Sequence, residues 1–281
     1  MTKNKLEAII EAHRLWLMTE GKEGERADLS RMELSDIDLS DKDLTDANLA
    51  YADLTYANLA NTKLIDADLT DADLGYAILV NANLANANLT KTRLTDANLT
   101  NANLANANLT KTRLTDANLT NANLTNANLT NATLTNTILI HADLTDADLA
   151  YANLTNANLT NANLTNAKLI RADLTGANLT NAILAHVDLT NANLTYANLT
   201  NTILIHADLT NAGFTTADLT NAILTRADFT YTDFGDANLT NTNFIRADLT
   251  NANLTNAILV DTDLTGALTK ECIPAHIADA C

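Results

Sequence analysis

The chain has 281 residues and a formal net charge of −17, with one Pro, seven Gly and one Trp. The negative charge argues against direct binding to nucleic acid or anionic membranes and favours a partner that carries positive charge. No apolar run reaches the roughly 18 residues of a membrane span, and no secretory signal begins the chain, so we expect a cytoplasmic protein.

The first 26 residues predict a helix and a linker. Asn4 and Glu7 have the spacing of a capping box at the helix start, and Gly21 is expected to end the helix. Apolar residues recur with helical spacing at Leu6, Ile9, Ile10, His13, Trp16 and Leu17. We interpret residues 1–26 as a cap over the open end of the segment that begins at Ala27, with a partner-binding helix as the alternative. On this face, His13 is expected to be packed rather than catalytic.

Residues 27–266 repeat a unit of five residues. Every fifth position from Leu29 to Leu264 is Leu or Phe, and the residue two before it is Ala at 36 of these 48 positions. A period of five fits neither a helix nor an alternating strand. It fits a chain that turns a corner every five residues, with Leu and Ala inward and the polar residues outward. Four sides then close a coil of 20 residues, the length of the block Asn81–Thr100, which Asn101–Thr120 repeat letter for letter.

Units such as ADLTD, ANLTN and ADFTY resemble those of the pentapeptide-repeat family, over about 240 of the 281 residues. The resemblance implies an all-β solenoid, a right-handed quadrilateral β-helix of about twelve coils with the Leu, Phe and Ala positions in its lumen. Three residues depart from the small inward position in the first coil: Met32, Ile37 and Lys42. A buried ammonium is costly unless it reaches the end of the solenoid, so we expect an irregular first coil beneath the helix.

Residues 20 positions apart stack in adjacent coils, which sorts the outward residues into columns. Acidic residues concentrate in the first coils, where Asp36, Asp53 and Asp73 share one face and are candidate protein contacts. The basic residues gather at one corner of the duplicated coils, at Lys91, Arg93, Lys111 and Arg113. The two interpretations of this corner are charge compensation, by Asp71 and Asp73 of the coil before, and phosphate binding.

A second candidate contact surface is apolar. Ile183, Ile203 and Ile223 stack at the position before the inward Leu, and Ile205 and Ile245 stand beside them. His186, His206, Arg226 and Arg246 line the edge of this surface. An exposed apolar row is typical of contact surfaces, and β-branched residues also pair well between strands, so both interpretations stay open.

The repeat loses its phase at residues 267–281. Pro274 predicts a short helix to Ala280, which caps the last coil or packs against a second copy and so gives a homodimer through the C-terminal end. Cys272, His276 and Cys281 lack a fourth ligand and a standard spacing, so we expect no metal. No cofactor is expected either.

The sequence contains no phosphate-binding Gly loop, nucleophile elbow or zinc-protease motif, and a regular solenoid lacks the concavity of an active site. We therefore predict a non-enzymatic, acidic, protein-binding or scaffold rod with an unidentified protein partner. The alternative comes from the resemblance, because quinolone-resistance members of the family are DNA mimics that bind DNA gyrase or topoisomerase IV. The absence of interrupting loops and the largely Asn/Thr stretch from Leu79 to Leu139 weigh against that alternative. A third interpretation is a stable coil extended by duplication without a specific surface function.

Overall fold

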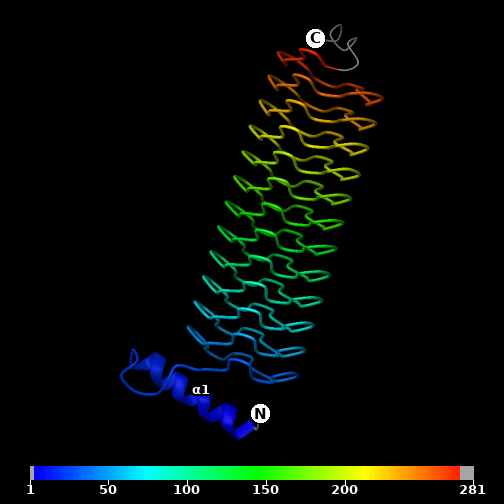
Figure 1. Ribbon diagram of the computed structural model, residues 1–281. Helices are drawn as coiled ribbons and strands as arrows, with labels where there is room; N and C mark the ends of the chain where they lie inside the picture. The colour runs from blue at the N-terminus through cyan, green and yellow to red at the C-terminus, as the bar shows by residue number, and fades with distance from the viewer. Residues whose placement is uncertain (1–2, 273–281) are drawn as a thin grey trace. The chain divides into compact units, whose positions relative to one another are not determined.

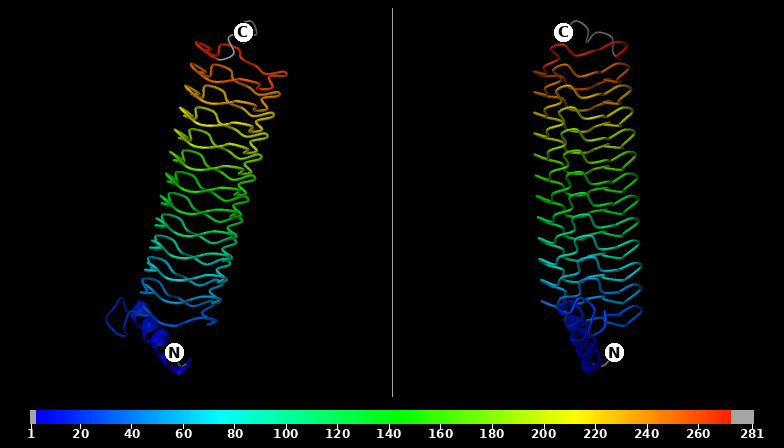
Figure 2. Two further views of the ribbon diagram at one scale, coloured as in Figure 1. Left: turned by 45° about the vertical axis from the view of Figure 1, so that its right-hand side comes forward. Right: turned by 90° about the vertical axis from the view of Figure 1, so that its left-hand side faces the viewer.

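The structure is a computed structural model that describes residues 3–272. The chain divides into two compact units, Met1–Thr133 and Leu134–Cys281, called here the first and second units. Within each unit, successive coils lie parallel to one another (Figures 1 and 2). Residues pair through parallel bridges with residues 20 positions further on, as Asp28 does with Asn48 and Ile138 with Asn158. The predicted 20-residue coil is therefore confirmed, and in the described chain each bridge is a single residue rather than part of a longer strand.

The N-terminal helix α1 spans Lys3–Met18 and lies beside the first coil of the first unit (Figure 1). Gly21 ends it as predicted, with a φ of 80° and an N–H that donates to the Trp16 carbonyl at 2.8 Å. Asn4, expected as the N-cap, already lies inside α1. The predicted start is therefore wrong by a residue or two, because capping patterns locate helix ends only to that precision.

The apolar face of α1 packs against the first coil. Leu6 and His13 are buried, and the Nδ1 atom of His13 accepts a hydrogen bond from the Ala27 N–H at 3.1 Å. This bond leaves the proton of the neutral ring on Nε2, which is buried and has no hydrogen-bond partner in the described chain. Burial lowers the pKa of His13. The predicted packing of His13 is confirmed.

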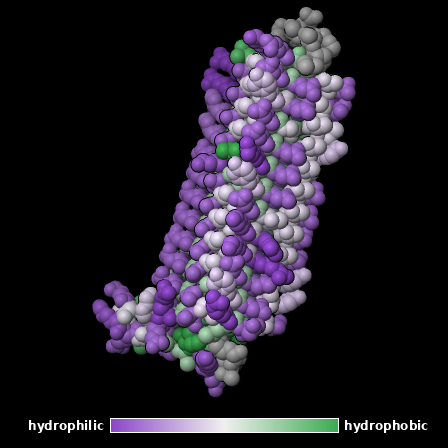
Figure 3. All heavy atoms as spheres, viewed as in Figure 1, coloured by the Kyte–Doolittle hydropathy of each residue, from purple (hydrophilic) through white to green (hydrophobic). Residues whose placement is uncertain are grey.

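The inward positions form the core of each unit. The Leu and Phe residues are at most 5% exposed at all of these positions except the half-buried Leu259, and most of the Ala residues are buried too. Four aromatic rings contact one another in the second unit, at Phe214, Phe229, Phe234 and Phe244. Hydrophilic side chains cover most of the face shown in Figure 3. At roughly 2 kcal/mol for each large apolar side chain, these columns dominate the stability of each unit.

One repeat, residues 68–72, shows where the backbone hydrogen bonds go. The N–H groups of Asp68, Leu69 and Asp71 donate to carbonyls of neighbouring coils at 2.8 to 3.0 Å. The Ala72 N–H donates to the Leu69 carbonyl and closes a β-turn. The remaining N–H, that of Thr70, donates to the Asp68 side chain at 3.0 Å. All five donors are thus satisfied, and the Asp or Asn before each Leu is explained by this turn.

The residue two after each inward Leu or Phe has a left-handed backbone, with φ between 53 and 67°. Asn and Asp tolerate this conformation better than other residues with a Cβ, which explains their abundance at the corners. Asn side chains at this position also bond between coils, as the Asn101 amide does to Asn81 Oδ1 at 3.1 Å. The sequence correctly indicated corners that accept side chains.

The first coil also shows how its unusual residues are accommodated. Lys42 is exposed, and Met32 and Ile37 are half-buried. No coil precedes this one, so the Lys42 side chain reaches solvent at the end of the first unit and its ammonium is not buried.

At the other end of the described chain, parallel pairing extends to Leu268, which bridges to Asp248. Cys272 takes a small inward position, and its buried thiol donates to the Leu249 carbonyl at 2.7 Å. The helix predicted for residues 274–280 lies outside the described residues, as do His276 and Cys281. No helix between residues 3 and 272 is both long and apolar enough to cross a membrane.

Candidate protein-contact surfaces

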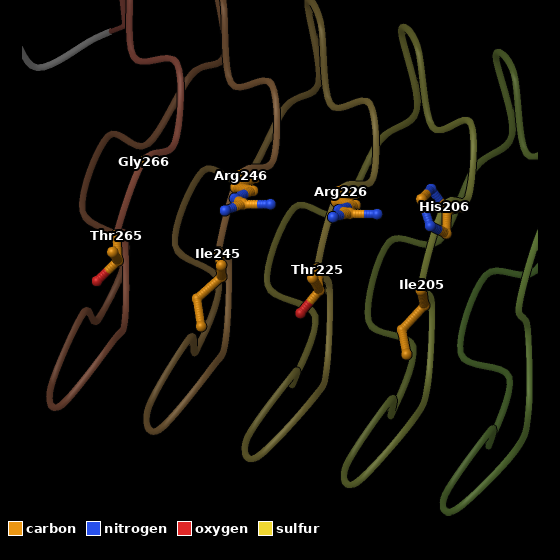
Figure 4. A pocket seen from close by; sticks show the side chains of 8 residues that line it. All are labelled: Ile205, His206, Thr225, Arg226, Ile245, Arg246, Thr265 and Gly266. Atoms are coloured by element: carbon orange, nitrogen blue, oxygen red, sulfur yellow. The ribbon is translucent and has the colours of Figure 1, made fainter.

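An open groove of about 530 Å³ lies on the second unit. We call it the Ile–Arg groove, and its lining residues are Ile205, His206, Thr225, Arg226, Ile245, Arg246, Thr265 and Gly266 (Figure 4). One column holds the residues that come directly after an inward Leu or Phe, and the other holds the residues of the left-handed corners. The groove is therefore built from the same two repeat positions in successive coils.

The two columns differ in chemistry. Ile205 and Ile245 are half-buried, whereas Arg226 and Arg246 are exposed. Figure 4 shows the Ile and Thr side chains in one row and the His and Arg side chains in a second row beside it. Neither Arg forms an ion pair within residues 3–272. The groove thus offers apolar contact area next to two uncompensated guanidinium groups.

The other predicted apolar residues form a separate column of the second unit. Ile183 bridges to Ile203, and Ile203 bridges to Ile223, so the predicted stacking is confirmed. Ile183 is 41% exposed and Ile223 is 38% exposed. These three residues precede the inward Leu and do not line the Ile–Arg groove. Of the five predicted Ile contacts, only Ile205 and Ile245 meet in the groove.

The Ile column has a cost for the backbone beside the groove. Ile203 and Ile223 stand where most repeats have Asp or Asn, so no side-chain oxygen reaches the N–H two residues later. The N–H groups of Ile205 and Thr225 consequently make no hydrogen bond in the described part of the chain, whereas the Ile245 N–H donates to Asn243 at 2.9 Å. The groove therefore contains two backbone donors without acceptors.

An acidic column, which we did not predict, lies just beyond the basic edge in the sequence. It begins two residues after the His186 corner and consists of Asp188, Asp208, Asp228 and Asp248, which bridge in succession. The signal was present in the sequence as four Asp residues at intervals of 20. The surface of the second unit therefore carries apolar, basic and acidic columns in that order.

The three predicted acidic contacts lie in the first unit but differ in their surroundings. Asp36 is exposed at a left-handed corner, with a φ of 56°. Asp53 and Asp73 are half-buried and bridge to one another, and Asp53 also bridges to Glu33. The three residues Glu33, Asp53 and Asp73 thus form one acidic column, and Asp36 stands outside it.

The oxygens of this column already have partners. Asp53 Oδ1 accepts bonds from the Thr55 hydroxyl and N–H at 2.6 and 3.0 Å, and these bonds lower the pKa of Asp53. Asp73 Oδ1 accepts the Gly75 N–H, and its Oδ2 lies 3.0 Å from an Arg93 nitrogen. Both carboxylates are therefore ionised at neutral pH, with part of their bonding capacity committed to the coil.

Within residues 3–272, no group of three or more His, Cys, Asp or Glu residues is arranged to hold a metal ion. The His pair of the second unit, His186 and His206, stacks with ring centroids 5.1 Å apart. The candidate surfaces are thus described by shape, charge and hydrogen bonding.

The family model for pentapeptide repeats matches the chain in eight copies between residues 25 and 268. HetL, a pentapeptide-repeat protein involved in heterocyst differentiation regulation from the cyanobacterium Nostoc sp. strain PCC 7120, is 34% identical. That match covers 91% of this chain and 95% of HetL, with a TM-score of 0.37. A pentapeptide-repeat protein from the Arabidopsis thaliana thylakoid lumen is also 34% identical, over 36% of this chain and 71% of that chain, with a TM-score of 0.36.

QnrB1, a plasmid-mediated fluoroquinolone resistance protein, is 18% identical over 68% of this chain and 88% of its own, with a TM-score of 0.30. Among proteins with curated descriptions, none matches significantly. The family model spans most of the chain, and the family implies the right-handed quadrilateral β-helix expected from the repeats. The chain belongs to the pentapeptide-repeat family.

Proposed function

We propose that this chain is a non-enzymatic binding protein whose Ile–Arg groove holds an extended, acidic and apolar segment of a partner protein. The observation that carries the proposal is the combination of Ile205 and Ile245 with two unpaired Arg side chains and two backbone donors without acceptors. Each of these features needs a complementary group, and one peptide segment supplies all of them.

The groove determines the chemistry of the segment. Its aliphatic side chains pack against Ile205 and Ile245, and its carboxylates face Arg226 and Arg246, whose guanidinium groups suit carboxylate recognition. Its carbonyl oxygens accept bonds from the free N–H groups, as in other complexes where an extended peptide uses main-chain hydrogen bonds. Charge complementarity therefore favours an acidic segment over a basic one.

The acidic column adds a second requirement. Asp228 and Asp248 each lie two residues after an Arg of the groove. A segment made only of acidic residues is repelled by this column, which works as discrimination against wrong partners. The preferred partner therefore carries an acidic and apolar core with basic residues at one side, which also suits the overall charge of −17.

A peptide-display selection against the full chain tests the proposal. We expect enrichment of peptides that combine aliphatic and acidic residues, and at least tenfold weaker binding of the selected peptide to the Arg226→Asn/Arg246→Asn variant. Asn is the common residue at left-handed corners, so this variant keeps the coil. A second variant, Ile205→Thr/Ile245→Thr, places at these positions the residue already found at Thr225.

Matched controls separate the groove from other surfaces. The variant Arg171→Asn removes a corner Arg of the same unit outside the groove and is expected to bind the selected peptide like the parent. The proposal fails if no acidic and apolar peptides are enriched, or if the groove variants bind as tightly as the parent protein.

The acidic columns of the first unit support a second candidate, mimicry of DNA in binding gyrase or topoisomerase IV. Hydrogen bonds to Ser30, Ser40 and Thr55 lower the pKa values of Asp28, Asp38 and Asp53, so this surface stays charged well below neutral pH. A gyrase supercoiling assay, with and without a fluoroquinolone, tests it. Neither inhibition nor protection at micromolar protein eliminates this candidate.

We also infer about twelve coils, with α1 as the cap of the first. The 20-residue pairing within each unit and the uninterrupted repeat over residues 27–266 support this count.

A further inference from the structure

We propose that the basic corner of the first unit is a binding site for a doubly charged oxyanion of the phosphate-ester class. An open concavity of about 300 Å³ lies at this corner, lined by Asp71, Lys91, Arg93, Lys111 and Arg113. The site is separate from the Ile–Arg groove, so this inference does not depend on the proposed function.

The repeat geometry gathers like charges in this concavity. Arg93 and Arg113 bridge directly as neighbours in adjacent coils. Lys91 and Lys111 occupy the preceding left-handed corner in the same two coils, with φ values of 59 and 60°. Four cations therefore belong to two consecutive coils, where each raises the electrostatic free energy of the others.

Charge compensation accounts for only half of the cluster. Lys91 lies 4.0 Å from Asp71, and Arg93 lies 3.0 Å from Asp73. Neither Lys111 nor Arg113 forms an ion pair with any described residue. Four basic and two acidic groups leave a local charge of +2, which matches a phosphate-ester dianion.

The residue types also suit this ligand. The planar guanidinium of Arg donates two parallel bonds to a phosphate, and Lys adds a mobile point charge. Arg93 and Arg113 stand where most repeats have an Asp or Asn, so the N–H groups of Thr95 and Thr115 make no hydrogen bond within residues 3–272. Two successive coils give up a turn bond to place these cations, which a need for solubility alone does not explain.

The neighbouring acids limit the site to a small ligand. Asp96 and Asp116 lie three residues after the Arg residues, at the far corner of the same side. A long polyanion that runs across this side meets these carboxylates, whereas a single phosphate group at the near corner does not.

The experiment uses the full chain with N-acetyl-O-phosphoserine amide, inorganic phosphate and sulfate as probes, at constant ionic strength. The ³¹P line width of each phosphate probe is expected to show saturable binding at one site per chain, displaced by sulfate. Tighter binding of the phosphoserine probe indicates a phosphorylated protein as the source, and tighter binding of inorganic phosphate indicates the free ion. Absence of saturable binding by both overturns the proposal.

The variant Lys111→Asn/Arg113→Asn removes the two unpaired cations. Both substitutions install the residue most common at their repeat positions, so the coil is expected to stay folded, as circular dichroism checks. Binding is expected to fall at least tenfold. The control Lys5→Gln/Lys22→Gln changes the net charge equally, away from the site, and is expected to bind like the parent. Equal loss in both variants shows a nonspecific effect of net charge and overturns the proposal.

A pH titration gives an independent readout. A phosphoserine has a second pKa of about 6, so its dianion fraction falls about fourfold between pH 7.5 and 5.5. The Lys and Arg side chains stay charged over this range. Phosphoserine affinity is therefore expected to fall about fourfold, while sulfate affinity stays constant. A parallel fall for sulfate contradicts recognition of the dianion.

Discussion

The left-handed corners make a prediction that reverses a common rule of protein stability. In ordinary backbone conformations, Gly is less stable than Ala by about 0.5–1 kcal/mol, because it loses more freedom on folding. At Asn101, where φ is 59°, we expect the opposite order. The Asn101→Gly variant should be more stable than Asn101→Ala.

The surroundings of Asn101 set the magnitude. Its side chain bonds to Asn81 and to Asn121, both at 3.1 Å, and it is exposed. Either substitution removes both bonds, at about 0.5 kcal/mol each for exposed groups. Ala adds a left-handed backbone cost of about 1–2 kcal/mol, which Gly avoids. We expect losses of about 2–3 kcal/mol for Ala and roughly 1 kcal/mol less for Gly.

Urea unfolding monitored by circular dichroism measures the difference. Thr100 supplies the matched control, since it precedes Asn101 and is absent from the left-handed positions. Thr100→Ala should be more stable than Thr100→Gly, in the usual order. If Ala is also the more stable residue at position 101, the corner conformation does not govern the choice of Asn, and the reasoning is wrong.

Other features of the structure give three further predictions. Leu99→Ala should destabilise the first unit by about 2–5 kcal/mol in urea unfolding, because Leu99 is fully buried, whereas Leu99→Ile should cost less than about 1.5 kcal/mol. The pKa of His13 is lowered by burial, so the unfolded chain binds more protons below pH 6.5 and the docking of α1 should weaken as the pH falls from that value; Trp16, the one Trp, reports this by fluorescence, and a constant signal down to pH 5 refutes it. Light scattering should give a mass of about 60 kDa, twice 30.1 kDa, for the homodimer predicted through the C-terminal end, and Leu268→Lys should shift it to monomer because Leu268 is 59% exposed in the last described coil.

The coil and its inward columns were predictable because one strict period determines both. The conformation of the corner was not assigned to a residue, although the excess of Asn and Asp two positions after Leu indicated it. A period gives the spacing of corners, whereas the backbone conformation of each residue depends on the turn. The role of Asp68 in satisfying the Thr70 N–H depends on the same geometry.

The candidate surfaces were predictable only in part. Columns such as Ile183 to Ile223 emerge from counting residues in steps of 20. The ion pair between Asp73 and Arg93 depends on side-chain directions that the spacing does not give. The free N–H groups beside the Ile–Arg groove were also missed, because they arise from the loss of an oxygen two residues earlier.

The exact copy of Asn81–Thr100 in Asn101–Thr120 has a consequence for how such a gene changes length. Unequal crossing-over between the two copies adds or removes 20 residues, which is one full coil. Every column then keeps its face, because the bridges join residues 20 positions apart. A change of five residues keeps Leu inward but moves each later residue to the next face. Recombination in units of 20 therefore varies the number of coils while it preserves surface patterns, and recombination in units of five recombines those patterns on an unchanged core.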